Sequence, residues 1–361
     1  MNAQQLAKWS ARSIVTLGFL PSVGLLSAAA CLLLLPAKAF AQSNCGKAPK
    51  LIFIDGFRDL PFPPPVDAPP PVTLPAGSTP LAIQITSPAS GAVTRRNQIE
   101  VKGTFDGPPN TGITINGNTA FLHGNQFVLP ALKLPAGQST IEARGVSMSG
   151  SSQVATANVT VDPEASVEPV VFDAARAGGF APMPITFSWS AVAPLEFVRV
   201  EVDFDGNGVF ELDTTDLSTP LKHVYRVPGV YLARLRLTTA PPASATYETT
   251  RAVVSVNSNY VRATLCYVYE RMRTELAASN VPGALQMLHP DLRPRFDTFW
   301  TANLAQLPTI APQLGTVADG VLGRDTAQLM VTQSVVGQTE PDAYFINFEP
   351  DSDGIWRITG M

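Results

Sequence analysis

Apolar and polar residues alternate with a period of two over much of the middle of this chain. The clearest apolar positions occur at every second residue. They are Val198, Val200, Val202 and Phe204, and later Tyr231, Ala233, Leu235 and Leu237. Strands with one buried face show this alternation. The turn Gly206-Asn207-Gly208 and the corner Pro228-Gly229 lie between the two runs. The pattern predicts a β-sandwich over residues 163–257.

A second alternating region precedes this one. Ile99, Val101 and Phe105 alternate with polar residues. Further on, Ile113-Thr114-Ile115 leads into Asn116-Gly117, a strong hairpin signal. Short strands that recur at such spacing are typical of a sandwich. We therefore expect a first sandwich over residues 81–162.

After residue 257 the apolar spacing becomes helical. Apolar residues recur at intervals of three or four at Val261, Leu265, Val268, Met272 and Leu276. Asn280 is placed to cap a second helix through Ala284–Leu288. A third apolar stripe comprises Leu292, Phe296, Phe299, Trp300, Leu304 and Leu307. The period returns to two after Gly315, so helices followed by antiparallel strands predict an α+β unit over residues 258–361.

Residues 1–41 have the pattern of a signal peptide. Lys8 and Arg12 precede an almost wholly apolar run, Ile14–Leu35, and Ala39-Phe40-Ala41 has the form of a cleavage site. The run is nearly long enough to span a bilayer, so an uncleaved membrane anchor is the main alternative. Lipidation of Cys31 is a third interpretation. We expect an exported protein that is periplasmic, on the cell surface or secreted.

Residues 42–80 combine an N-terminal strand with a proline-rich linker. We expect Leu51-Ile52-Phe53-Ile54 to dock as an extra strand on one of the domains. The proline runs between residues 58 and 80 favour an extended spacer. Cleavage after Ala41 leaves Cys45 and Cys266, which either form a disulfide or remain isolated thiols.

The low charge of the chain restricts its partners. Charged residues make up 15% of the sequence and the net charge is −4, whereas soluble domains usually hold about 25% charged residues. No cluster of Lys and Arg occurs, so a nucleic-acid partner is not expected. The histidines His123, His223 and His289 fall in different domains and complete no zinc pattern. We expect His223 to form a hydrogen bond within its own sandwich.

Both sandwiches resemble known immunoglobulin-like (Ig-like) modules. Ser87-Pro88, Ile113–Gly117 and Ala136–Ile141 are similar to the bacterial module first named from glucodextranase domain B. Val202–Gly208 and His223–Tyr231 resemble the PKD (polycystic kidney disease) type, although the Trp that opens the first PKD motif is absent. Both resemblances imply accessory or spacer modules that carry no catalytic residues.

The last domain resembles the nuclear-transport-factor-2-like fold, an α+β cone of helices packed on a curved antiparallel sheet. The resemblance rests on the order of elements, on Leu288–Phe296 and on the closing run Asp353–Ile358; a cystatin-like sheet is the nearest alternative. It implies a pocket between helices and sheet, and some relatives are isomerases or dehydratases. Candidate pocket residues are His289, Asp291, Trp300, Tyr344 and Trp356. The competing interpretation is structural, with Asp291 at a helix start that favours a carboxylate.

Asp203, Asp205 and Asn207 match the opening of a calcium-binding EF-hand loop. The twelfth position is Thr214 rather than the bidentate Glu, and strand residues precede the loop. A hairpin turn is therefore favoured over a weak Ca²⁺ site. No other cofactor is expected.

These patterns predict a non-enzymatic binding or scaffold protein of the cell envelope or surface. In this interpretation the Ig-like modules are spacers that present the C-terminal domain to another envelope or surface protein. One alternative is a small-molecule or glycan-binding protein, although Phe121, Phe127 and Trp189 are expected to be buried rather than displayed to a glycan. A second is an enzyme that uses the C-terminal pocket. Membrane contact is expected only if the N-terminal segment is uncleaved.

Overall fold

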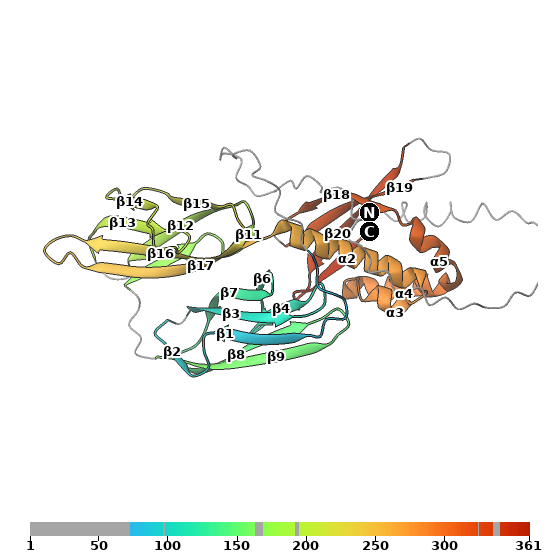
Figure 1. Cartoon of the computed structure of the whole chain (residues 1–361), viewed down its shortest axis with the longest axis horizontal. Helices are drawn as coiled ribbons and strands as arrows, with labels where there is room; N and C mark the ends of the chain where they lie inside the picture. The colour runs from blue at the N-terminus through green and yellow to red at the C-terminus, as the bar shows by residue number, and fades with distance from the viewer. Residues whose placement is uncertain (1–72, 97, 163–168, 192–194, 324, 335–339) are drawn as a thin grey trace, which may run out of the picture. The chain divides into compact units, whose positions relative to one another are not determined.

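The computed structural model describes residues 73–96, 98–162, 169–191, 195–323, 325–334 and 340–361 (Figure 1). The expected signal peptide, the apolar run at residues 51–54 and Cys45 lie outside these residues and stay predictions. Within the described ranges, no helix combines the length and the hydropathy needed to cross a membrane.

The first sandwich is built from two facing sheets. Its strands are β1 (Ala82–Ser87), β2 (Ala92–Thr94), β3 (Gln98–Asp106), β4 (Gly112–Ile115), β5 (Asn118–Thr119), β6 (Phe121–His123), β7 (Gln126–Lys133), β8 (Gly137–Val146) and β9 (Ser152–Val161). One sheet has the order β1-β3-β7-β6 and the other β2-β9-β8-β4-β5. Between them lie Val101, Phe127 and Ile141, all fully buried. The predicted hairpin is confirmed, because Asn116 (φ 46°) and Gly117 (φ 79°) join β4 to β5.

The second sandwich has the same two-sheet construction. Its strands are β10 (Val170–Ala174), β11 (Gly178–Phe180), β12 (Met183–Ala191), β13 (Phe197–Asp203), β14 (Leu212–Thr214), β15 (Leu221–Tyr225), β16 (Gly229–Thr239) and β17 (Thr246–Val256). The sheets have the orders β10-β12-β15 and β11-β17-β16-β13-β14. The alternation predicted for β16 is confirmed, since Ala233, Leu235 and Leu237 are fully buried.

Val198 corrects the expected alternation in β13. Its side chain is 41% exposed, whereas Val200 and Val202 are buried as predicted. The register of β13 against β16 shifts between Phe197 and Arg199, and this bulge turns Phe197 into the core in place of Val198. Trp189 is only partly buried and packs edge-on against Phe197, with 5.6 Å between ring centroids.

The loop between β13 and β14 is held by hydrogen bonds to buried groups. The fully buried carboxylate of Asp203 accepts hydrogen bonds from the backbone N–H groups of Gly206 (2.7 Å) and Gly208 (2.9 Å). The Tyr225 hydroxyl donates to the carbonyl oxygen of Phe204 (2.7 Å), which ties the loop to β15. These bonds are those of the hairpin-turn interpretation.

His223 makes ring contacts instead of the predicted hydrogen bond. Its imidazole stacks on Phe204 (4.8 Å between centroids) and lies edge-on to Tyr225 (4.6 Å), and it has no hydrogen bond to a described residue. Burial lowers the pKa of His223 below its ordinary value of 6.5, partly opposed by the charges of Glu211 and Asp205.

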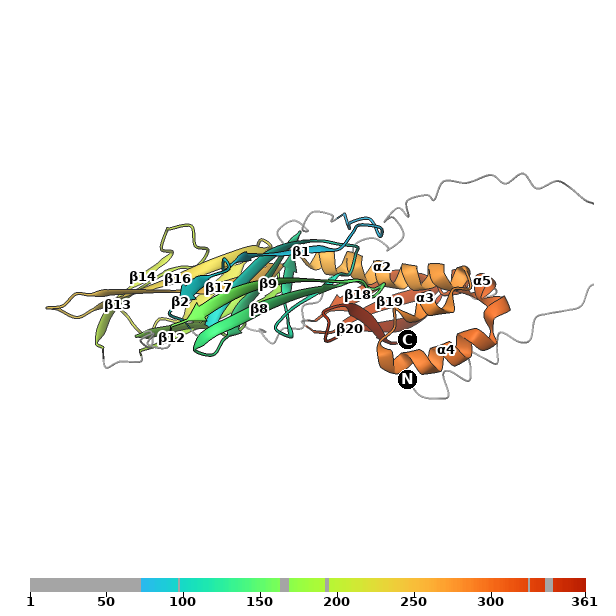
Figure 2. The ribbon, with the colours of Figure 1, turned by 90° about the horizontal axis from the view of Figure 1, so that it is seen from below.

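The C-terminal region packs helices on one face of a sheet. The helices are α2 (Ser258–Ala277), α3 (Val281–Leu285), α4 (Arg293–Ala302) and α5 (Leu307–Ile310), and the strands, in their order across the sheet, are β18 (Thr316–Leu322), β19 (Ala327–Gln333), β20 (Asp342–Pro350) and β21 (Trp356–Gly360). Both views show α2 lying along this sheet (Figures 1 and 2). One core joins Leu265 and Met272 of α2 to Leu329 and Phe348 of the sheet.

The predicted helices are confirmed with two changes. Every apolar position predicted for α2 is buried, and Asn280 caps α3 by accepting a hydrogen bond from the N–H of Gly283 (3.2 Å). However, α3 ends at Leu285, before the expected end at Leu288. Phe299 is exposed although it lies within α4, and Leu304 is exposed in a 3₁₀ turn beyond the end of α4 at Ala302. The assignment of this region to the nuclear-transport-factor-2-like fold stays a prediction.

Replacing Asp203 by Ala is expected to lower the free energy of unfolding by about 1–3 kcal/mol, because two backbone N–H groups lose a charged acceptor. Urea unfolding followed by circular dichroism measures the loss. Asp216→Ala is the matched control, since that carboxylate accepts its hydrogen bond from Ser218 in an exposed turn. Equal losses in the two variants would contradict the role assigned to Asp203.

The free energy of unfolding is expected to fall as the pH drops from about 7.5 to about 5.5. The unfolded chain takes up a proton at His223 near pH 6.5, whereas the half-buried imidazole of the folded protein has a lowered pKa and resists protonation. Stability from this group is therefore fully present above pH 6.5 and lost below it. His223→Phe should flatten the pH dependence of the urea midpoint, and His123→Asn should not; identical profiles for wild type and His223→Phe would overturn the assignment.

Candidate functional site

Asn110 joins the first sandwich to the C-terminal sheet. Its side-chain amide nitrogen donates to the carbonyl oxygen of Trp356 (2.8 Å), and its amide oxygen accepts from the N–H of Trp356 (3.0 Å). Asn110 is only 4% exposed and has a φ of 60°, a left-handed conformation that Asn adopts more readily than most residues. The bonded residues are 246 positions apart in the sequence.

The backbones come into close contact beside this pair. A Cβ atom added to Gly112, at the start of β4, would lie 2.2 Å from the carbonyl oxygen of Asp353. The turn that carries Asp353 is held by Arg357, whose guanidinium donates to Asp351 (2.9 Å) and to both carboxylate oxygens of Asp353 (2.8 and 2.6 Å). Glycine is therefore required at position 112. The turn between β20 and β21 that contacts the sandwich is held in shape by the hydrogen bonds of Arg357.

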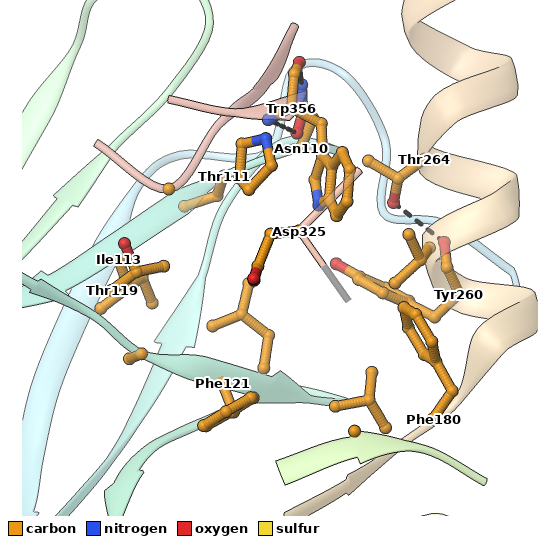
Figure 3. Close-up of a pocket in the computed structure, with 17 residues that line it drawn as sticks. Asn110, Thr111, Ile113, Thr119, Phe121, Phe180, Tyr260, Thr264, Asp325 and Trp356 are labelled. Carbon is orange, nitrogen blue, oxygen red and sulfur yellow. Dashed lines mark hydrogen bonds between the residues drawn. The ribbon is translucent and has the colours of Figure 1, made fainter. Parts of the chain in front are cut away.

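A cavity of about 290 Å³ lies next to this contact (Figure 3). The first sandwich, strand β11, helix α2 and the β20–β21 hairpin all contribute to its wall. The larger side chains in the wall are Ile113, Phe121, Leu122, Phe180, Tyr260, Val261 and Trp356. Ligand sites are typically cavities of this kind, mostly apolar and placed where domains meet. We take this cavity as the candidate binding site.

Most polar side chains in the wall are already hydrogen-bonded within the protein. Asn110 is occupied by Trp356, Thr111 donates to the carbonyl of Pro108 (2.7 Å), and Thr264 donates to the carbonyl of Tyr260 (2.9 Å). Asp325 also has an interaction partner. The hydrogen-bonding capacity of the wall is therefore largely used up by the protein itself.

The phenol of Tyr260 and the indole N–H of Trp356 have no hydrogen-bond partner among the described residues, and both rings border the cavity (Figure 3). Burial raises the pKa of Tyr260, so its hydroxyl stays protonated at neutral pH. Thr119 also lines the cavity, and its hydroxyl has no hydrogen bond to a described residue. The rest of the described wall is apolar, internally bonded or, at Asp325, already paired.

Of the pocket residues predicted from the sequence, only Trp356 lines this cavity. Trp300 lies in the core, 4% exposed, with its ring 5.2 Å from that of Phe296. The hydroxyl of Tyr344 donates to the carbonyl of Leu314 and lies 3.3 Å from the hydroxyl of Tyr269, and burial raises its pKa. These side chains fill the space between helices and sheet where a pocket was expected.

His289 and Asp291 lie away from the cavity, at the start of the short 3₁₀ turn Pro290–Leu292. The Nδ1 atom of His289 accepts from the N–H of Asp291 (3.4 Å), and the Asp291 side chain is 88% exposed. This arrangement matches the structural interpretation of these residues. The expected contribution of His289 and Asp291 to a pocket stays a prediction.

The acidic loop of the second sandwich brings Glu211 into the predicted cluster. Carboxylate oxygens of Asp203, Asp205 and Glu211 lie within 4.8 Å of one another. Asn207 turns its oxygen to the N–H of Val209 (2.7 Å), and Glu211 accepts from the N–H of Phe204 (2.7 Å). Each of these side chains has a hydrogen bond that a hairpin turn explains, and the Ca²⁺ site stays a prediction.

Cys266 lies in α2, is 6% exposed and is disulfide-bonded. The other cysteines of the sequence, Cys31 and Cys45, lie outside the described residues. A disulfide at Cys266 is therefore present, and its pairing with Cys45 stays a prediction.

The comparisons with known proteins concern the sandwich fold alone. No protein-family model and no curated protein matches the chain. Fibronectin(III)-like modules of Clostridium thermocellum CbhA are 12% identical, with a TM-score of 0.19 over 49% of this chain and 95% of that chain. A tetra-tandem repeat from the extending region of a large adhesion protein is 17% identical, with a TM-score of 0.19 over 49% of this chain and 50% of that one.

Bacteroides ovatus SGBP-B, solved in complex with a mixed-linkage heptasaccharide, is 14% identical, with a TM-score of 0.17 over 49% of this chain and 47% of that one. This chain therefore spans about half the length of SGBP-B and of the adhesion-protein repeat. These neighbours are Ig-like or fibronectin-III-like sandwiches and surface proteins.

Asn110→Ala is expected to speed hydrogen exchange of the Trp356 amide by about five- to tenfold, because this N–H loses a side-chain acceptor worth roughly 1 kcal/mol. Exchange mass spectrometry of peptides covering residues 353–360 measures the effect. Asn116→Ala is the control, since Asn116 also has positive φ but lies in an exposed hairpin of the same sandwich. Unchanged exchange in Asn110→Ala would mean that this pair does not hold the contact.

Proposed function

We propose that this protein is a non-enzymatic, exported binding protein, and that it holds a small, largely apolar molecule in the cavity between the first sandwich and the C-terminal region. The observation that carries this proposal is the mostly apolar, 290 Å³ cavity at a junction braced by the Asn110–Trp356 pair. A pre-formed cavity lowers the cost of binding because little of the protein has to be ordered by the ligand.

The size of the cavity sets the size of the ligand. An apolar cavity of about 150 Å³ is sufficient for benzene. The 290 Å³ available here therefore suits a molecule of about two fused rings. Burial of apolar surface contributes about 25 cal/mol per Å², so a ligand of this size is expected to bind with a Kd between micromolar and millimolar.

Export is supported by the pattern of residues 1–41 and by the disulfide at Cys266. Disulfides persist in oxidising compartments and are rare in the cytoplasm. The low content of charged residues, 15%, fits the same class of protein. We therefore assign the protein to the periplasm, the cell surface or the secreted fraction.

The contacts at Asn110 and Gly112 give the first sandwich a larger role than that of a spacer. A spacer needs only to hold two parts at a distance, whereas this sandwich supplies Ile113, Phe121 and Leu122 to the wall of the cavity. Presentation of the C-terminal domain to a protein partner remains compatible with this role.

The proposal is tested by filling the cavity. Thr119, an exposed residue at its wall, is replaced by Phe, and the binding of tetralin (1,2,3,4-tetrahydronaphthalene) is measured by saturation-transfer NMR and thermal unfolding. Tetralin should raise the Tm of the wild type, and Thr119→Phe should weaken binding at least tenfold.

Thr140→Phe is the matched control, since Thr140 is an exposed strand residue of the same sandwich and does not line the cavity. This variant should bind tetralin like the wild type. Absence of binding to the wild type, or equal binding to both variants, would overturn the proposed function.

A further inference from the structure

We infer that the molecule bound in this cavity is uncharged and carries a hydrogen-bond acceptor, such as a ketone, lactone or ether oxygen, that receives hydrogen bonds from the phenol of Tyr260 and the indole N–H of Trp356. The inference rests on the proposed function, since it specifies the chemistry of the ligand at that same site.

Tyr260 is positioned by the first turn of α2. Its backbone N–H donates to the carbonyl of Asn257 (3.0 Å), and its own carbonyl accepts from the hydroxyl of Thr264 (2.9 Å). The backbone is thus held at both ends while the phenol ring faces the cavity (Figure 3). Tyr260 is partly buried and its hydroxyl bonds no described residue, so a ligand acceptor would supply the partner that solvent otherwise supplies.

Trp356 is positioned from the opposite wall. The side chain of Asn110 forms hydrogen bonds with both the N–H and the carbonyl of Trp356. The neighbouring Arg357 donates hydrogen bonds to Asp351 and Asp353. The indole therefore has a fixed place, facing the same space as the Tyr260 phenol (Figure 3). Two donors that approach one space from different elements select an acceptor by position as well as by type.

The charges of the described lining residues favour an uncharged ligand. Among the residues that the structure describes, the side chains that line the cavity include no Lys, Arg or His, so these residues offer a carboxylate or phosphate no counter-ion. Asp325 is the one acidic side chain in this lining, and it already has a partner. Burying an unpaired charge is far more costly than burying a neutral group, and the ligand is accordingly uncharged.

The same count of polar groups argues against a sugar in this cavity. A sugar ring carries several hydroxyl groups, and each needs a partner when it is buried. Asn110, Thr111 and Thr264 are already bonded within the protein, which leaves the two donors and the hydroxyl of Thr119 among the described side chains. An apolar molecule with one or two acceptor oxygens matches this wall.

The test compares tetralin with 1-tetralone, which has nearly the same shape and adds one ketone oxygen. The ratio of their Kd values is measured for the wild type and for Tyr260→Phe by isothermal titration calorimetry. Tyr260→Phe should reduce the preference for 1-tetralone roughly 3–10-fold, the value of one hydrogen bond. Tyr267→Phe, a change of the same kind in α2 at a residue that does not line the cavity, should leave the ratio unchanged.

A second readout reports the hydrogen bond directly. The infrared carbonyl stretch of bound 1-tetralone should lie at lower frequency in the wild type than in Tyr260→Phe. The Kd ratio and the carbonyl frequency could both be unchanged in Tyr260→Phe while Thr119→Phe still weakens the binding of tetralin. That result would refute the inferred hydrogen bond to a ligand acceptor and leave the proposed function intact. If neither compound binds the wild type, the proposed function itself is wrong.

Discussion

The paired hydrogen bonds between the side chain of Asn110 and the backbone of Trp356 are the constraint on which the candidate site depends. They hold a loop of the first sandwich against the last hairpin of the chain, and Gly112 allows the two backbones to meet closely. A side-chain amide that bonds both the N–H and the carbonyl of one residue fixes the relative orientation of the two segments, which apolar packing alone does not. The cavity and its two donors exist because this contact leaves space beside α2.

The cavity lies outside the C-terminal domain rather than inside it. In a fold of helices on a curved sheet, the interior is expected to hold the pocket, but here Trp300 and Tyr344 fill that interior with a packed ring and a bonded hydroxyl. These side chains occupy positions where the pocket was expected. The cavity described above lies instead at the edge, where side chains of the sandwich and of α2 face each other.

In the second sandwich, the polar residues that looked functional in the sequence form contacts within the module itself. Asp203, which the sequence presents as a metal ligand or a turn residue, is fully buried and bonded to the N–H groups of Gly206 and Gly208. His223 is held by ring contacts, and Tyr225 supplies the hydrogen bond to the loop. The conspicuous polar residues of this module therefore serve its stability, and its contribution to the cavity comes from Gly179 and Phe180 of β11 and Val256 of β17.

The sequence by itself determined the local elements: the strands of both sandwiches, the buried face of α2 and the Asn116-Gly117 hairpin, because periodicity and turn chemistry act between near neighbours. It did not reveal the inward turn of Phe197, since a bulge depends on the partner strand. Tertiary structure alone decided the site, because Asn110 and Trp356 are 246 residues apart and no spacing rule links them. Of the predicted pocket residues only Trp356 lines the cavity, and Tyr260 is proposed as a ligand donor because of the cavity beside it, which no sequence pattern records.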